Sequence, residues 1–177
     1  METEVWALAM VNALAASTLL TAGLAKHVSP APVRRALREA VPVLETRALS
    51  ALSRGFATAE IVVGVALSIN SLRIPAALAA ASLGACFVAL GLRGQFGRST
   101  APCGCFGSSS QRPLGWSNVA VGVALIGAGP VNLAVTPGEQ HPAVAILLTA
   151  IGSIVLCGYV NRTLILRLLR PAPHAST

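Results

Sequence analysis

The strongest constraint on the fold is a series of five apolar windows, with nearly all charged residues gathered in the stretches between them. Crossing about 30 Å of hydrocarbon as an α-helix takes about 20 residues, and each window is about that long. Charged residues make up only 11% of the chain, whereas soluble domains contain about a quarter. We therefore predict an all-α integral membrane protein, a bundle of about five transmembrane helices with a four-helix core plus one. The windows are Val5–Ala25, Gly55–Leu72, Ile74–Leu92, Pro113–Gly138 and Gln140–Asn161.

The basic residues indicate how these helices are oriented, because cytoplasmic loops of membrane proteins carry an excess of Lys and Arg. With five alternating helices, twelve of the thirteen basic residues fall on one side, and only Arg73 falls on the other. We therefore predict a multi-pass protein of the cell (inner or plasma) membrane. Its N-terminus, with Glu2 and Glu4, would lie outside and its C-terminus in the cytoplasm. The basic residues on the cytoplasmic side are Lys26, Arg34, Arg35, Arg38, Arg47, Arg54, Arg93, Arg98, Arg112, Arg162, Arg167 and Arg170.

The two ends of the chain carry further expectations. Acidic residues precede the first window, whereas a signal peptide begins with a positively charged region, so we expect this window to be retained as a helix. A length of 177 residues fits a single domain. The C-terminal tail, Pro171–Thr177, is expected to be disordered.

The long basic loop from residue 28 to residue 54 contains a candidate amphipathic helix, Val33–Leu44. Its apolar side chains share one face, opposite three arginines, which suits the surface of an anionic membrane leaflet. A plain solvated loop accounts for the pattern equally well. The net charge of +7 does not indicate nucleic-acid binding, because the basic residues are not interleaved with aromatic ones. We expect the lipid bilayer, and no nucleic acid, as a partner.

The most reactive feature is a polar, glycine-rich loop between the third and fourth helices, residues 93–114, which contains Cys103-Gly104-Cys105. A disulfide across such a pair closes a small, constrained ring, and a bond with unfavourable geometry is easier to reduce. Gly104 gives the backbone the freedom to bend there. The two cysteines are therefore a candidate reactive thiol pair, with two incidental loop cysteines as the alternative.

Glu60 is the only Asp, Glu, Lys or Arg inside the five windows. An ionised group within a membrane costs on the order of a few kcal/mol unless it is paired or faces a cavity. Lys26, at the end of the first window and on the same side of the membrane, is the natural partner. The pair could be purely structural, or it could take part in proton transfer.

Several polar residues and cysteines are expected at the cytoplasmic face of the bundle. Asn118 lies just inside the fourth helix and Cys157 near the end of the fifth, on the same side as the ion pair and the Cys-Gly-Cys loop. Cys86 falls in the same half of the third helix. The outer half of the bundle is expected to hold almost no polar residue with a functional role.

At these residues the chain resembles the MauE branch of the DoxX-like membrane proteins. The similarity in layout covers most of residues 5–160 and implies one MauE/DoxX-like transmembrane domain over residues 1–177. Cys86 and Cys157 are not part of the shared motif, so their roles stay open. The likeness rests on Cys103-Gly104-Cys105-Phe106-Gly107, supported by Ala25-Lys26, Ala59-Glu60 and Trp116-Ser117-Asn118.

The resemblance implies a helical-bundle membrane protein linked to methylamine utilisation. MauE-like proteins assist maturation of the disulfide-rich small subunit of methylamine dehydrogenase, and a thioredoxin-like protein usually accompanies them. The general role that follows is thiol-disulfide exchange with a thioredoxin-like protein or an exported disulfide-containing substrate. The enzymatic reading is accordingly a thiol-disulfide oxidoreductase.

In the mechanism that we expect, Cys103 or Cys105 forms a mixed disulfide with a cysteine of the partner, and the other cysteine resolves it. The sequence leaves open which of the two is the nucleophile. Nearby cations favour the reactive thiolate, and Lys26 could supply part of that field. Glu60 could accept or shuttle a proton. The candidate catalytic residues are Cys103, Cys105, Glu60 and Lys26, and the supporting residues are Gly104, Phe106, Gly107, Asn118, Cys86 and Cys157.

Two other classes of function fit the same residues. The cysteine pair could bind a soft cation such as Cu(I) or Zn(II). A complete tetrahedral site would need further ligands, with His27 and Cys157 as the nearest candidates, and we assign no metal site. The third class is a non-catalytic assembly factor that holds a partner at the membrane.

The predicted orientation conflicts with the implied function. It places every cysteine in the cytoplasmic half, whereas oxidative maturation of an exported subunit takes place outside. An inverted orientation, electron transfer through a quinone, or chemistry on the cytoplasmic side would each resolve the conflict. Inversion would leave three separate basic segments outside, so we retain the cytoplasmic assignment of the Cys-Gly-Cys loop.

Overall fold

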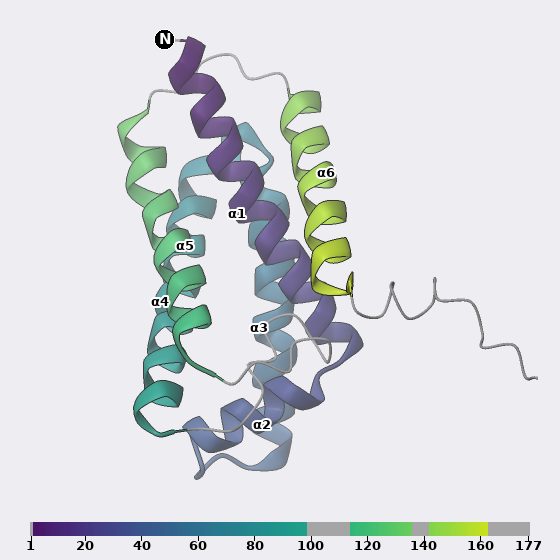
Figure 1. Ribbon diagram of the computed structural model, residues 1–177, viewed down its shortest axis with the longest axis vertical. Coiled ribbons are helices and arrows are strands. Elements are labelled where there is room, and N and C mark those ends of the chain that lie inside the picture. Colours follow the sequence, from purple (N-terminus) through teal and green to yellow (C-terminus); the bar gives the residue numbers. More distant parts are fainter. Residues whose placement is uncertain (1, 99–113, 136–141, 163–177) are drawn as a thin grey trace, which may run out of the picture.

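The protein, seen here as a computed structural model, is almost entirely helical in the residues that the structure describes, which are 2–98, 114–135 and 142–162. These segments contain six α-helices, one short 3₁₀ helix and no strand (Figure 1). Five of the helices are long and apolar enough to cross a membrane, which confirms the predicted multi-pass bundle. The elements are α1 (Glu2–Val28), α2 (Ala31–Ala40), α3 (Thr46–Leu67), η1 (Asn70–Leu72), α4 (Arg73–Phe96), α5 (Trp116–Ala134) and α6 (Pro142–Val160).

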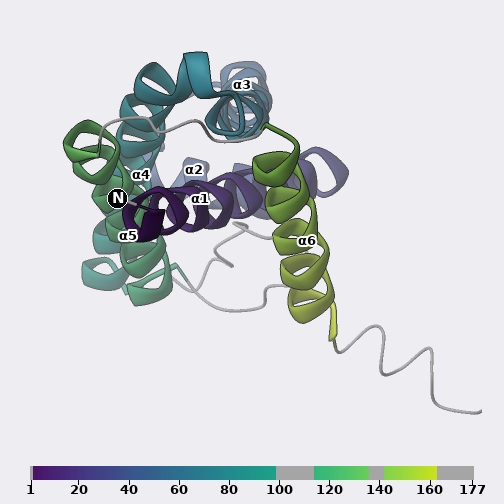
Figure 2. The same ribbon diagram turned by 90° about the horizontal axis from the view of Figure 1, so that it is seen from above.

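Four of the spans form the core of the bundle, and the fifth lies at its edge. α1 packs against α3, α4 packs against α5, and α3 also contacts α4. α6 packs on α1, on the side away from α4 and α5 (Figure 2). Only 6% of the most apolar stretch of α6 is buried in the protein, so most of this helix is left to contact lipid.

α4 and α5 approach one another closely at two facing glycines. A Cβ atom added to Gly84 would lie 2.6 Å from the carbonyl oxygen of Gly122, and one added to Gly122 would lie 2.5 Å from the carbonyl oxygen of Gly84. Small residues of this kind let membrane helices pack backbone against backbone, where the hydrophobic effect gives no drive for association. The hairpin of α4 and α5 therefore depends on both glycines.

The basic loop folds as the short helix α2, which lies across one end of the bundle (Figure 1). Its Val33 and Ala36 side chains are buried, and the helix contacts α3 and α4. The apolar face thus packs on the protein, which differs from both interpretations of the sequence, a helix on the lipid leaflet and a plain solvated loop. Pro42 follows directly after α2, and α3 begins at Thr46, ahead of the predicted start at Gly55. The helix extends beyond the apolar window through residues 46–54, where charged residues such as Arg47 are exposed.

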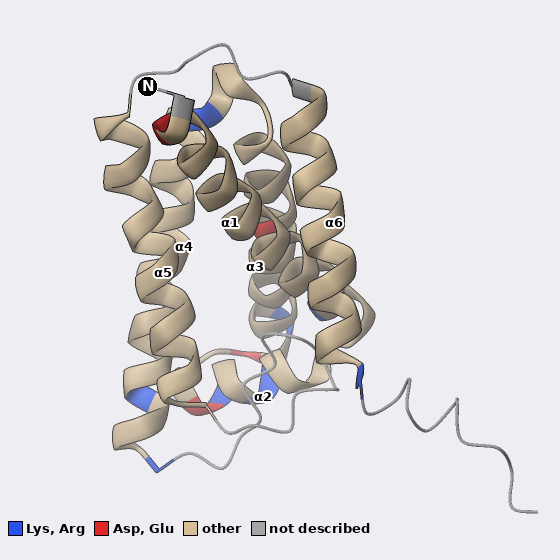
Figure 3. Cartoon of the chain, turned by 45° about the horizontal axis from the view of Figure 1, so that its top comes forward, with Lys and Arg blue, Asp and Glu red and all other residues tan. Residues whose placement is uncertain are grey.

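The two ends of the bundle differ in charge (Figure 3). Lys and Arg gather at the end where α2 lies, which is also where α1, α4 and α6 end and α5 begins. Of the basic residues in the described segments, Arg73 alone lies at the opposite end, at the start of α4. We call these the basic end and the Arg73 end. The predicted separation of basic residues between the two faces is therefore present in the fold.

Candidate functional site

Lys26 and Glu60 form a buried ion pair between α1 and α3. The Lys26 Nζ atom donates to both carboxylate oxygens of Glu60, at 2.6 and 2.8 Å. Lys26 is 3% exposed and Glu60 is fully buried. The predicted pairing is confirmed, and it places one positive and one negative charge inside an apolar bundle, toward its basic end.

Two phenylalanine rings complete the surroundings of the ammonium group. The Nζ atom of Lys26 lies 5.2 Å from the centroid of the Phe87 ring and 5.7 Å from that of Phe56. The rings pack edge to face, with centroids 5.6 Å apart. The face of an aromatic ring stabilises a desolvated cation, so both rings help to offset the cost of burying the charge. Neither ring was predicted from the sequence, although Phe56 lies one helical turn before Glu60 and therefore on the same face of α3.

Close packing of α1 against α3 positions the ion pair. Gly23 precedes Lys26 by less than one helical turn, and a Cβ atom added there would lie 2.8 Å from the carbonyl oxygen of Ala57 and 3.2 Å from the Glu60 Cβ atom. Without this glycine the two helices would have to separate. Gly23 therefore allows α1 and α3 to pack closely enough for Lys26 to contact the Glu60 carboxylate.

Asn118 lies at the same end of the bundle, in the first turn of α5. Its side chain is buried, with 2% of its surface exposed, and its backbone N–H donates to the carbonyl oxygen of Gly115 at 2.9 Å. A Cβ atom added to Gly91 of α4 would lie 3.0 Å from the Asn118 Cβ atom, so α4 packs directly on it. The prediction that Asn118 lies just inside the fourth helix at this end is confirmed.

The predicted Cys-Gly-Cys-Phe-Gly segment, residues 103–107, lies outside the described residues, as does the tail Pro171–Thr177. α4 ends at Phe96 at the basic end, where the chain is described as far as Arg98 and again from Leu114, just before α5. The segment that carries the two cysteines is therefore attached at the end of the bundle toward which the Lys26–Glu60 pair lies.

The other predicted residues are not gathered around the ion pair. Cys86 on α4 and Cys157 on α6 are free thiols with exposed side chains, and their helices lie on opposite sides of α1 (Figures 1 and 2). His27 is exposed, and its Nε2 atom is 3.3 Å from the Thr58 hydroxyl. Within residues 2–98, 114–135 and 142–162, no three His, Cys, Asp or Glu side chains are placed to hold a metal ion.

The outer half of the bundle also contains buried, hydrogen-bonded polar side chains, which were not predicted from the sequence. Asn12 of α1 and Asn132 of α5 are both buried and exchange side-chain hydrogen bonds of 3.1 and 2.7 Å. Arg73 is 3% exposed and its Nη2 atom donates to the carbonyl oxygen of Val135 at 3.2 Å. Both asparagines were visible in the sequence as polar residues within apolar windows. Their pairing could not be foreseen without knowing that α1 lies beside α5.

A family model matches most of the chain. No curated protein and no solved structure matches the chain. The family model of the methylamine utilisation protein MauE matches residues 4–136, which run from the start of α1 to the end of α5. The matched range includes the four core spans, the ion pair and the cysteine-bearing segment, and it leaves α6 outside. The chain therefore belongs to the MauE family of methylamine utilisation membrane proteins.

Proposed function

We propose that this protein is a membrane thiol-disulfide oxidoreductase in which Cys103 and Cys105 exchange a disulfide with a thioredoxin-like partner. The single observation that carries the proposal is the buried Lys26–Glu60 pair, which lies toward the end of the bundle where the cysteine-bearing segment is attached. Two charges inside an apolar bundle are costly, and ionisable residues within membrane spans commonly mark sites of proton or ion chemistry.

The exchange is a balanced transfer of two electrons. A thiolate of one dithiol attacks one sulfur of the other protein's disulfide, which forms a mixed disulfide and releases a thiolate. The second cysteine of the attacking pair then attacks the mixed disulfide, so that one protein ends with a disulfide and the other with two thiols. Two protons leave the dithiol that is oxidised, and two are taken up by the thiolates that are released. The direction of transfer depends on the reduction potentials of the two pairs.

Fixed positive charge near the cysteine pair would favour the reactive thiolate. The basic residues at this end of the bundle and the N-terminus of α5, which begins at Trp116, both contribute positive potential there. We assign Lys26 to this electrostatic role and Glu60 to the acceptance or relay of the proton that leaves the attacking thiol. Asn118, buried at the start of α5, would hold the segment that leads from the cysteines in place.

We further propose that the basic end faces the cytoplasm, following the excess of Lys and Arg there. Within methylamine utilisation, the exchange would serve maturation of the disulfide-rich small subunit of methylamine dehydrogenase. A cytoplasmic cysteine pair would then act on a thioredoxin-like carrier on that side, or pass electrons to a quinone, and would not meet the exported subunit directly.

The test is to trap the mixed disulfide. Cys103→Ser and Cys105→Ser are made separately in a chain that also carries Cys86→Ser and Cys157→Ser. Each is mixed with thioredoxin that lacks its resolving cysteine and whose remaining cysteine is activated as a mixed disulfide with thionitrobenzoate, so that the attacking thiolate displaces thionitrobenzoate. One of the two single-serine variants should form an adduct that a reductant dissolves, and the variant lacking both loop cysteines should form none. If neither variant forms an adduct, and the parent chain instead binds Cu(I) or Zn(II) stoichiometrically, the redox assignment fails and metal handling replaces it.

A further inference from the structure

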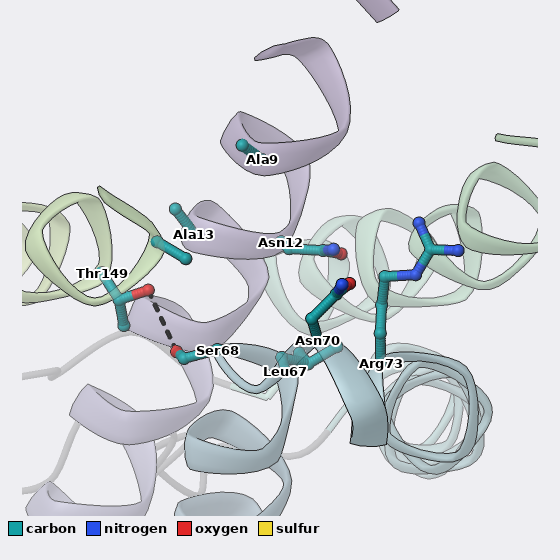
Figure 4. Close-up of a pocket in the computed structure, with 9 residues that line it drawn as sticks. Ala9, Asn12, Ala13, Leu67, Ser68, Asn70, Arg73 and Thr149 are labelled. Atoms are coloured by element: carbon teal, nitrogen blue, oxygen red, sulfur yellow. Dashed lines mark hydrogen bonds between the residues drawn. The ribbon is translucent and has the colours of Figure 1, made fainter. Parts of the chain in front are cut away.

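A small polar pocket lies at the Arg73 end of the bundle, away from the Lys26–Glu60 pair (Figure 4). It is formed where α3, η1 and α4 meet α1 and α6. In the close-up the amide ends of Asn12 and Asn70 lie on the same side of the pocket as the Arg73 guanidinium, and Ser68 and Thr149 lie on the other.

Arg73 is the residue in this pocket whose hydrogen bonding is incomplete. Its side chain is 3% exposed, and its Nη2 atom donates to the carbonyl oxygen of Val135. The Nη1 atom is buried and has no hydrogen-bond partner in the structure. Among the described residues, no carboxylate lies within ion-pair distance of this guanidinium. Burying a group that is always charged costs free energy when one of its donors has no acceptor and no counter-charge lies nearby. A bound group that supplies both a hydrogen-bond acceptor and a negative charge would remove this cost.

The remaining polar groups of the pocket are largely satisfied within the protein. The Asn12 amide is paired with Asn132, and the Ser68 and Thr149 hydroxyls are 3.2 Å apart and share a hydrogen bond. The Asn70 side chain is exposed at the mouth of the pocket and can donate a second hydrogen bond beside Arg73. The free donors thus lie on one side, and both suit a negatively charged oxygen.

We propose that this pocket binds an oxyanion group, held by the guanidinium of Arg73 with Asn70 as a second donor. The planar guanidinium fork matches the oxygens of a phosphate or carboxylate, and such charge-assisted hydrogen bonds are stronger than neutral ones. The pocket admits one such group and not a whole substrate. Ile69, Leu72 and Ile74, which are next to Asn70 or Arg73 in the sequence or within two residues of them, are all more than 40% exposed. An anionic lipid head group at the membrane surface and a free phosphate ion share the required chemistry.

Glu139 is a candidate competitor for the site from the chain itself. Glu139 lies a few residues beyond Val135, whose carbonyl oxygen already accepts from Arg73. If the Glu139 carboxylate occupied the pocket, no external oxyanion would be needed. The experiment therefore includes Glu139→Gln, which removes this competitor's charge while it preserves the length of the side chain.

The test uses the full chain in nanodiscs. Native mass spectrometry would count phosphatidylglycerol retained from a mixture with phosphatidylcholine, and a separate titration would measure thermal stabilisation by inorganic phosphate in phosphatidylcholine alone. The variants are Arg73→Gln and Arg73→Lys, with Arg54→Gln as the matched control, because Arg54 is an exposed arginine toward the basic end. Loss of a charge-assisted hydrogen bond should weaken oxyanion binding about tenfold or more in Arg73→Gln.

Arg73→Lys should show a smaller loss, and Arg54→Gln should bind as the parent does. Dependence of retained phosphatidylglycerol on Arg73 would identify a lipid head group as the ligand, and dependence confined to the phosphate titration would identify a free anion. The proposal is overturned if Arg73→Gln and Arg73→Lys both bind phosphatidylglycerol and inorganic phosphate as the parent does. If Arg73→Gln does not fold, Arg73→Lys alone decides the outcome. The proposal is equally overturned if binding appears only after Glu139→Gln.

Discussion

Lys26 and Glu60 are 34 residues apart in the sequence, yet their side chains meet at 2.6 Å in the interior of the bundle. They join the end of α1 to the middle of α3, under the rings of Phe56 and Phe87. The pair accounts for the one acidic residue within the apolar windows, and it is the only ion pair between side chains of the described segments. Lys26 lies in the last turn of α1, which ends at the basic end of the bundle.

Removing one partner of this pair should destabilise the protein strongly. Glu60→Gln leaves the Lys26 ammonium buried without its counter-charge. Lys26→Met likewise leaves the Glu60 carboxylate buried without its counter-charge. Each change should cost about 3 to 5 kcal/mol of unfolding free energy, measured by equilibrium unfolding in mixed detergent micelles. The double variant Lys26→Met with Glu60→Met should recover much of the loss, because two apolar side chains of similar volume replace two charges.

The same double variant separates a structural role from a chemical one. If Lys26 and Glu60 act on the cysteine pair, the double variant should be stable but slow in exchange with thioredoxin. Exchange at the parent rate in a stable double variant would contradict the chemical role and leave the pair as a structural element alone.

The facing glycines of α4 and α5 predict that alanine substitutions at two glycines of α5 differ strongly in their effect on the unfolding free energy. Gly122→Ala would bring a Cβ atom to 2.5 Å from the carbonyl oxygen of Gly84, so the helices must separate. Overpacking of this kind should cost about 1 to 3 kcal/mol. Gly127→Ala, on the same helix, meets nothing within 4 Å and should leave the unfolding free energy unchanged or slightly raised. Equal effects of the two substitutions would show that α4 and α5 do not pack at these glycines.

The amide pair of Asn12 and Asn132 predicts coupling between α1 and α5. Interhelical hydrogen bonds in membranes contribute about 0.6 kcal/mol on average and about 1.7 at most. Asn12→Ala and Asn132→Ala should each lower the unfolding free energy by about 1 kcal/mol, and the double-mutant cycle should show that their losses are not additive. Additive losses would mean that the two amides do not interact.

Much of the fold could be predicted from the sequence, because helices that cross lipid must be long and apolar and the charges between them mark the loops. The pairing of Lys26 with Glu60 was accessible for the same reason, since each is an isolated charge beside or within an apolar window. The burial of Val33 and Ala36 could not be predicted, because an amphipathic helix has the same sequence pattern whether its apolar face contacts lipid or protein. The rings of Phe56 and Phe87 and the amides of Asn12 and Asn132 come together only once the neighbours of each helix are known.

The measurement that tests the central claim most directly is alkylation of Cys103 and Cys105 in intact cells, in a chain that carries Cys86→Ser and Cys157→Ser. A membrane-impermeant maleimide is applied before and after the membrane is opened, with and without prior reduction. We predict that the pair is protected until the membrane is opened and that part of it reacts only after reduction, as a disulfide at the cytoplasmic face requires. Labelling from outside would contradict the proposed orientation, and thiols that are free in every sample would contradict the redox function.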